Sequence, residues 1–162
     1  MLQSSEQGSG IPGILRPFKE YLEKAHLSDE TQVIFFGLPG TCLPFVELLC
    51  YAVRSLPIIP IFVPGLDISQ ARKMIYHKEA GFQIGERVVL EDSAVFVLMG
   101  GLSMPASNIT VQDAEAFIKK YNPISILGIC FMSMFEKTGW TARVSFDLLI
   151  DATVTVEIFI NQ

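Results

Sequence analysis

The stretch Val33-Ile-Phe-Phe-Gly-Leu-Pro-Gly-Thr-Cys42 decides the fold of this chain. Its apolar run stops at Gly37, a short turn of small residues follows, and a helix-like segment occupies residues 43–54. The same order recurs over residues 94–101 and, more loosely, over residues 125–130. Strand, small-residue turn and helix in this order are typical of parallel α/β domains, which build their binding sites at the carboxyl ends of the strands.

Length and composition agree with such a domain. The chain has 162 residues, enough for one domain with a sizeable core. We expect a flexible tail over residues 1–10 and a single α/β domain over residues 11–162. Hydrophobic residues make up 50% and charged residues 18% of the sequence, and the mean hydropathy is +0.42. Strands covered on both faces account for these values, and an apolar dimer interface would add to them.

Several classes of protein are disfavoured. The formal net charge is −5 and no Lys/Arg cluster stands out, so we expect no nucleic-acid partner. The apolar run Ile124–Phe135 is too short to span a membrane, and Met1–Gly10 lacks the features of a signal peptide. The three cysteines, Cys42, Cys50 and Cys130, form no CxxC pair, which argues against a disulfide framework and a zinc ribbon. We therefore expect a cytoplasmic protein without a metal site or membrane insertion.

Periodicity and turn signals predict the elements along the chain. Helices are expected over residues 11–26, 43–54, 68–79 and 110–121, and strands over residues 33–36, 58–63, 94–99, 124–130, 146–150 and 153–160. Pro60 suggests that its strand lies at an edge. The predicted fold is α/β, a three-layer sandwich around a mostly parallel Rossmann-like or flavodoxin-like sheet. Because Val154, Val156 and Ile158 alternate with less apolar positions, we expect an antiparallel C-terminal edge strand.

The turn Gly37-Leu-Pro-Gly-Thr41 offers backbone N–H groups at the start of a helix, where a phosphate or carboxylate is favoured. It lacks the lysine of a phosphate-binding P-loop and the third glycine of a dinucleotide fingerprint. Two interpretations stay open. Gly37, Gly40 and Thr41 either contact an anion or satisfy a tight strand-to-helix turn that needs small residues.

The other two junctions supply the remaining walls of a predicted pocket. Gly100, Gly101 and Ser103 follow one strand, and Cys130, Phe131 and Met132 end the next. The carboxyl ends of parallel strands share one edge of the sheet, so these residues should face the first turn. The adaptable side chains of Met104, Met132 and Met134 either line this pocket or fill the core.

Single side chains leave further alternatives. Cys42, in the first turn of its helix, is either a small buried hydrophobe or a reactive thiol. Asp147 and Asp151 lie in an otherwise apolar run. A buried carboxylate needs a partner, so they form a structural ion pair or cap, with Arg143 as the nearest candidate partner, or they face the pocket.

Three segments together resemble a small family of archaeal proteins found mainly in methanogens. They are residues 99–105 (MGGLSMP), residues 128–140 (GICFMSMFEKTGW) and residues 146–152 (FDLLIDA). The resemblance covers nearly the whole chain after the N-terminal tail. It implies a stand-alone cytoplasmic domain of archaeal type with a Rossmann-like sheet. The family has no established activity, so the resemblance supplies no catalytic residues.

These observations support three functional hypotheses. The first is a protein of unknown function that binds a small anionic or nucleotide-like ligand at the carboxyl edge of the sheet. The second is a non-catalytic homodimeric interaction module that pairs through Thr153–Ile160. The third is a thiol-dependent enzyme that uses Cys42 or Cys130. The sequence identifies neither the ligand nor a cofactor.

Overall fold

A computed structural model describes residues 7–161 of the chain. A seven-stranded sheet with the order β4-β3-β2-β1-β5-β6-β7 forms its centre. The strands are β1 (Thr31–Gly37), β2 (Ile58–Pro64), β3 (Arg72–His77), β4 (Gly81–Arg87), β5 (Val95–Met99), β6 (Ser125–Phe131) and β7 (Leu148–Ala152). The α-helices are α1 (Gly10–Lys24), α2 (Pro39–Ala52), α3 (Val111–Tyr121) and α4 (Met134–Lys137). The 3₁₀ helices are η1 (Ile68–Gln70), η2 (Gly100–Ser103), η3 (Pro105–Ser107) and η4 (Trp140–Ala142).

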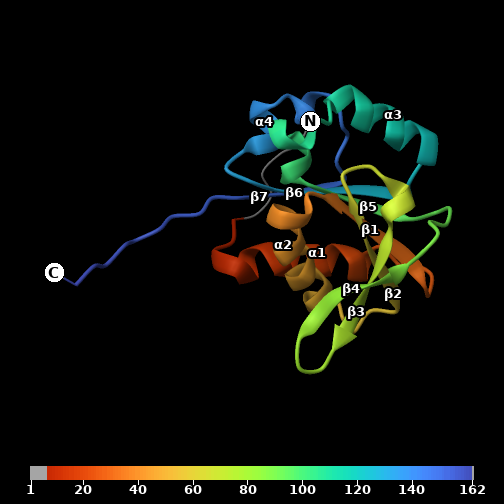
Figure 1. Cartoon of the computed structure of the whole chain (residues 1–162), viewed down its shortest axis with the longest axis horizontal. Helices are drawn as coiled ribbons and strands as arrows, with labels where there is room; N and C mark the ends of the chain where they lie inside the picture. Colours follow the sequence, from red (N-terminus) through yellow and green to blue (C-terminus); the bar gives the residue numbers. More distant parts are fainter. Residues whose placement is uncertain (1–6, 162) are drawn as a thin grey trace.

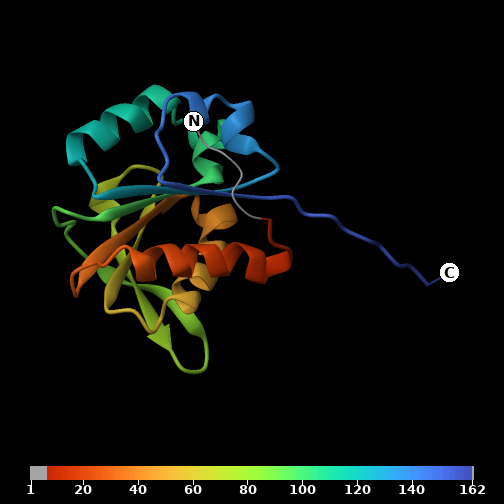
Figure 2. The same cartoon turned by 180° about the vertical axis from the view of Figure 1, so that it is seen from behind.

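The predicted three-layer α/β sandwich is confirmed. Helices α1 and α2 cover one face of the sheet, and α3 and α4 cover the other (Figures 1 and 2). Strands β2, β1, β5, β6 and β7 run parallel to one another. Their order along the sheet is that of flavodoxin-like domains, in which the chain moves from β1 first to one side and later to the other.

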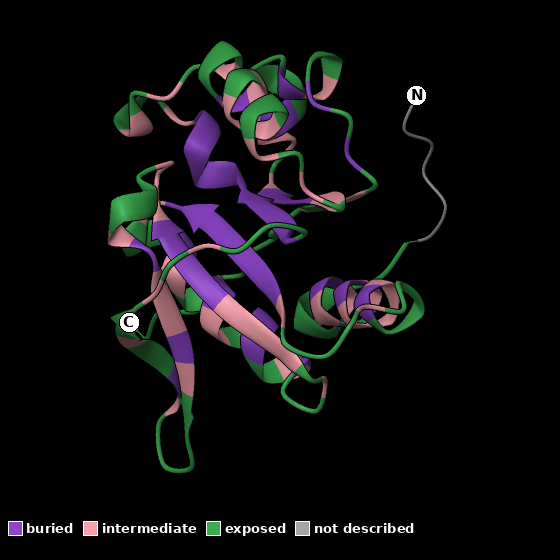
Figure 3. Ribbon diagram, turned by 90° about the vertical axis from the view of Figure 1, so that its right-hand side faces the viewer, coloured by how far each residue is buried: buried purple, intermediate pink, exposed green. Residues whose placement is uncertain are grey.

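The central strands are buried on both faces, as their continuous apolar sequences predict. In β1, Val33 and Phe35 pack in the core beneath α1 and α2, whereas Ile34 and Phe36 pack in the core beneath α3 and α4. Residues 95–99 of β5 are likewise all buried. Figure 3 shows this buried band through the middle of the sheet.

Two expectations about strand placement were wrong. The helix predicted over residues 68–79 is the short η1 followed by β3, which forms an antiparallel hairpin with β4. The prediction took Asp67 as an N-cap and Gly81 as the end of the helix. Asp67 caps only the short η1, because pairing with β2 and β4 outweighs local propensity. Pro60 does not mark an edge, since β2 lies between β1 and β3. Proline is tolerated because β3 pairs with β2 only at Ile61 and Phe62, beyond Pro60.

The C-terminal end of the chain also differs from expectation. The C-terminal edge strand is β7, and it is parallel to β6 rather than antiparallel. The antiparallel strands lie at the opposite edge, and residues 153–161 adopt no regular secondary structure. Of the flexible tail predicted over residues 1–10, residues 1–6 lie outside the described residues. Gly10 already belongs to α1.

Candidate functional site

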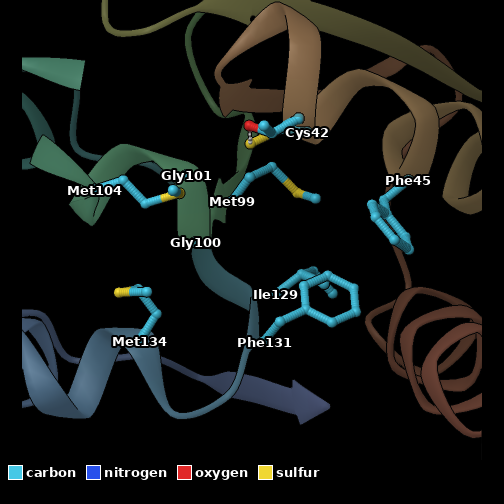
Figure 4. A pocket seen from close by; sticks show the side chains of 10 residues that line it. Cys42, Phe45, Met99, Gly100, Gly101, Met104, Ile129, Phe131 and Met134 are labelled. Atoms are coloured by element: carbon cyan, nitrogen blue, oxygen red, sulfur yellow. Dashed lines mark hydrogen bonds between the residues drawn. The ribbon is translucent and has the colours of Figure 1, made fainter. Parts of the chain in front are cut away.

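A pocket lies where the carboxyl ends of β1, β5 and β6 meet, as the three sequence junctions predict (Figure 4). Its volume is about 120 Å³. It is lined by Thr41, Cys42, Phe45, Met99, Gly100, Gly101, Met104, Ile129, Phe131 and Met134. None of these ten residues is charged, and four of them carry sulfur. The interior is therefore suited to an apolar group.

The first wall is the N-terminal part of α2. Leu38 is the N-cap and Pro39 the first helical residue, a position that needs no amide N–H. The side chains of Thr41, Cys42 and Phe45 point toward the pocket because residues three and four apart share a helix face. A Cβ at Gly37 would lie 2.7 Å from Cys42 Cβ, so close packing alone demands a glycine there.

The second wall is η2, which follows β5 directly. A Cβ on Gly100 would lie 2.7 Å from Cys130 Cβ, and one on Gly101 would collide with Cys42 Sγ. Both glycines therefore allow neighbouring elements to approach closely. Ser103 is buried, and its hydroxyl donates a hydrogen bond of 2.8 Å to the Gly100 carbonyl oxygen. Ser103 thus supports η2 from behind and does not line the pocket.

The third wall is the turn between β6 and α4. Met132 and Ser133 both have positive φ, 56° and 58°, which is unusual for residues other than glycine. Asp151 at the end of β7 holds the turn, since its carboxylate accepts hydrogen bonds from Ser133 N at 3.0 Å and Ser133 Oγ at 2.9 Å. This turn starts α4 and so places Met134 against the pocket. Left-handed pairs of this kind cost free energy and persist where the surroundings enforce them.

Changing this turn should alter stability in opposite directions. Asp151→Ala removes the acceptor of three hydrogen bonds, two from Ser133 and one from Cys130 Sγ, so we expect the free energy of unfolding to fall by about 1–2 kcal/mol. Met132→Gly should leave it unchanged or raise it by up to about 1 kcal/mol, because glycine relieves the left-handed backbone and Met132 is half exposed. Urea unfolding of both variants beside the unaltered protein measures the difference. Destabilisation by Met132→Gly as large as that by Asp151→Ala would contradict the strained turn.

Of the three thiols, only that of Cys42 lines the pocket. Cys42, Cys50 and Cys130 are all buried and free. Cys130 Sγ donates to Asp151 Oδ1 at 3.4 Å. Burial raises the pKa of Cys130 to about 12, with a further contribution from the Asp151 carboxylate, and burial also raises the pKa of Cys50. Because the thiolate is the nucleophile, Cys130 is unsuited to thiol catalysis at neutral pH.

Of the charged groups singled out in the sequence, Asp151 holds the third wall, whereas Asp147 and Arg143 do not line the pocket. Asp147 is at the other end of β7, where its carboxylate accepts a hydrogen bond of 2.8 Å from Ile126 N. Arg143 does not pair with either aspartate, because its guanidinium contacts Glu115 at 3.5 Å. Among residues 7–161, no cluster of three His, Cys, Asp or Glu side chains is placed to hold a metal ion.

The nine predicted site residues divide into two groups. Thr41, Gly100, Gly101 and Phe131 line the pocket. The other five lie beside or behind its walls: Gly37, Gly40, Ser103, Cys130 and Met132. Gly40 is exposed at the start of α2, and a Cβ there would meet nothing within 4 Å. Met132 is exposed, whereas Met104 and Met134 line the pocket. Two of the three methionines that were expected either to line the pocket or to fill the core therefore line the pocket.

Three lining residues were not anticipated from the sequence. Phe45 lies one helical turn after Thr41, a spacing that could have revealed it. Met99 is the last residue of β5, and Ile129 lies two residues before the end of β6. Side chains along each of these strands point alternately to the two faces of the sheet, and those on both faces are apolar. The sequence therefore does not show which of them border a pocket, whereas the position of α2 over the sheet does.

A second hollow, of about 310 Å³, lies between the C-terminal end of α2 and the strands β2, β3 and β4. Its lining includes Arg54, whose guanidinium carbon stands 3.9 Å from the Tyr51 ring centroid. Met74 and Phe82 close the hollow from the hairpin. It lies away from the carboxyl edge of the parallel strands, where ligands of open α/β sheets bind. The pocket at that edge is therefore the candidate site.

No helix among the described residues is long and apolar enough to cross a membrane.

Comparison with known proteins places the chain among archaeal sequences. Residues 9–155 match the profile of a family described as uncharacterized protein conserved in archaea. An uncharacterized protein from Methanocaldococcus jannaschii is 32% identical over 158 residues, which are 98% of this chain and 94% of that protein. An uncharacterized protein from Methanothermobacter thermautotrophicus is 35% identical over 143 residues, which are 86% of this chain and 91% of that protein.

A solved structure shares the same fold. The crystal structure of a protein of unknown function from Methanothermobacter thermautotrophicus is similar to this chain with a TM-score of 0.86 and 30% sequence identity. The similarity covers 99% of both chains. The arrangement of layers and strands is thus shared by a solved protein from a methanogen.

Proposed function

Because this chain belongs to the family of uncharacterized proteins conserved in archaea (DUF2124), its relatives bring no activity, and we propose a function from the pocket itself. The protein binds a small ligand that places an apolar group in the pocket and an anionic group at the N-terminus of α2. A nucleotide-like molecule has both parts. The observation that supports this most directly is the convergence of three strand ends on one uncharged pocket.

The position of the pocket in the sheet favours ligand binding. From β1 the chain passes through α2 to β2 on one side, and later reaches β5 on the other side of β1. Helices and loops that follow β1 and β5 therefore diverge, and a crevice opens outside their carboxyl ends. The pocket is lined by residues that follow both strands, Thr41 and Gly101 among them. Ligands of flavodoxin-like sheets bind at this switch point.

The start of α2 supports the anionic part of the ligand. The first turn of a helix leaves backbone N–H groups without intrahelical acceptors, and here these belong to Gly40 and Thr41. Leu38, the N-cap, makes no side-chain capping hydrogen bond, and the first turn holds no acidic residue. The helix dipole adds a partial positive charge at this end. A phosphate or carboxylate at the mouth of the pocket would satisfy these donors.

The size of the pocket limits what enters it. A volume of about 120 Å³ corresponds to roughly four water molecules at their share of the liquid. The side chains of Met104 and Met134 stand on one side of the space, and the rings of Phe45 and Phe131 on the other (Figure 4). Methionine side chains adapt to irregular shapes. The pocket therefore suits one small apolar group, with the polar remainder of the ligand outside.

The three free cysteines suit a reducing compartment, and we propose that the protein acts in the cytoplasm.

A thermal-shift screen tests the proposal. The panel contains nucleoside monophosphates, the matched uncharged nucleosides, small phosphorylated and carboxylated metabolites, and inorganic phosphate. A ligand at 100 times its dissociation constant adds about 2.7 kcal/mol of stability. For a domain of this size, that corresponds to a rise in Tm of roughly 5–10 °C. We expect anionic compounds with an apolar part to raise Tm, and the uncharged nucleosides to raise it less.

Two alanine variants assign any hit to the pocket. Gly101→Ala puts a methyl group against Cys42 Sγ inside the pocket, so it should weaken binding by at least about tenfold. Val89→Ala changes an exposed residue that does not line the pocket, so this variant should bind as the unaltered protein does. A panel without any stabilising compound, or equal binding by Gly101→Ala, would show that the pocket is not the site.

A further inference from the structure

The last part of the chain, Thr153–Ile160, forms an extended C-terminal arm. It continues from β7 and leaves the body of the molecule beside the N-terminal end of α1 (Figures 1 and 2). Its five large apolar side chains are between 56% and 89% exposed. They are Val154, Val156, Ile158, Phe159 and Ile160. Exposed apolar side chains gathered on one segment are typical of an interaction site.

The arm carries the residue pattern of a half-buried strand. Its even-numbered residues from Val154 to Ile160 are all aliphatic, whereas Thr155 and Glu157 on the alternate positions are polar. Successive side chains of a strand point to opposite faces. In β7, Leu148, Ile150 and Ala152 face the core beneath α1 and α2. If the arm extends β7 as a strand, its aliphatic side chains lie on that same face of the sheet.

Strand β7 offers the matching surface. It is the last strand of the sheet and pairs with β6 on one side only, so its outer edge is free among the described residues. An unpaired edge is a template for another strand. Each copy of the chain thus has one extended arm and one free edge next to it. A two-fold axis perpendicular to the sheet lets the arm of each copy pair with the free edge of the other copy. Such an axis makes the two paired segments antiparallel and keeps their aliphatic side chains on the same face of the sheet.

The geometry points to a homodimer in which each copy's β7 and arm pair antiparallel with β7 and the arm of a second copy. The two seven-stranded sheets then form one continuous sheet through the dimer. We take the partner to be a second copy of this chain, because β7 and the arm form one continuous segment. That segment supplies both a strand with an aliphatic face and the free edge with which such a strand can pair.

The register follows from charge and length. With Val154 on the two-fold axis, Asp151 would stand opposite Glu157 of the partner subunit, and like charges directly opposite are destabilising. With Thr153 on the axis, Phe159 and Ile160 would extend past the start of β7. Thr155 on the axis avoids both problems. This register places Ile150 opposite Ile160 of the partner subunit. It places Ala152 opposite the partner's Ile158, and Val154 opposite the partner's Val156.

Sedimentation equilibrium of the full chain tests the dimer. One chain has a mass of 18.0 kDa, and we expect twice that mass. Val156→Asp combined with Ile158→Asp places charges in the aliphatic ladder, so the dissociation constant of the dimer should rise by at least about 100-fold. Val89→Asp, at another exposed apolar position, is the control and should remain dimeric. A monomer at every accessible concentration, or a dimer that the double variant leaves intact, overturns the proposal.

Cysteine cross-linking tests the register. Directly opposite residues of antiparallel strands have Cα atoms about 4.5–5.5 Å apart, within reach of a disulfide. Thr155→Cys should therefore form a covalent dimer under mild oxidation. Thr153→Cys, two residues away on the same arm, would stand about 13 Å from its mate and should not. The native cysteines are buried and should not interfere. Cross-linking of Thr153→Cys without that of Thr155→Cys overturns the register.

Discussion

Replacing Phe36 with alanine should lower the free energy of unfolding by about 3–5 kcal/mol. Phe36 is fully buried in β1, the strand at the centre of the sheet. The centroid of its ring lies 4.7 Å from the ring centroid of Phe96 and 5.2 Å from that of Phe117, and both pairs have edge-to-face geometry. The substitution therefore loses buried apolar area and aromatic contacts, and it leaves a cavity between two sheet strands and α3.

Urea unfolding at one fixed protein concentration measures this effect, since association would otherwise change the apparent stability. Val89→Ala is the control, because Val89 is 83% exposed and surface changes of this kind fall within about 0.5 kcal/mol. A loss below about 1.5 kcal/mol for Phe36→Ala would mean that the core beneath α3 is loosely packed or collapses into the cavity.

The second large effect is a loss of stability in alkaline solution. Burial raises the pKa of Cys130 from 9.0 to about 12. The folded state therefore keeps its thiol proton above pH 9, where the unfolded state has lost it. Because the folded state then binds more protons, stability is fully present below pH 9 and declines as the pH rises toward 12. The slope approaches roughly 1 kcal/mol per pH unit, so the loss amounts to roughly 2 kcal/mol between pH 9 and pH 11.

Comparison with Cys130→Ala isolates this thiol from the other groups that titrate in the same range. The variant loses some packing at every pH, but its stability should decline less steeply than that of the unaltered protein between pH 9 and pH 11. Cys50 also has a raised pKa because it is buried, so a shallower decline persists in the variant. Identical slopes for both proteins would mean that Cys130 titrates normally in the folded state.

The architecture was largely predictable because its signals are local. Residues 33–36 and 94–99 form continuous apolar runs that end in glycine, and such runs are found where helices cover both faces of a strand. The turn at Gly37 and the glycine pair at Gly100 and Gly101 marked where those strands end. These signals correctly predicted the parallel core, the three layers and the edge at which the pocket lies.

The antiparallel part was not predictable from the same kind of signal. Residues 68–79 lie between Asp67 and Gly81, two signals of helix ends, yet they form η1 and β3 because the hairpin with β4 pairs against β2. At the other edge, Leu148–Ala152 runs parallel to β6 because α4 and η4 carry the chain back across the sheet. Strand direction depends on the path of the connection, which periodicity does not record.

Within the site, the sequence by itself determined which segments meet. The junctions after β1, β5 and β6 had to share one edge of a parallel sheet, so Thr41, Gly101 and Phe131 could be placed together. Only the tertiary structure decided how each residue is used. It made Gly37 and Gly100 points of close contact, turned Ser103 toward a backbone carbonyl, and brought Met104 and Met134 into the pocket. The reason is physical: strand ends follow from local pattern, whereas side-chain surroundings depend on contacts between residues far apart in the chain.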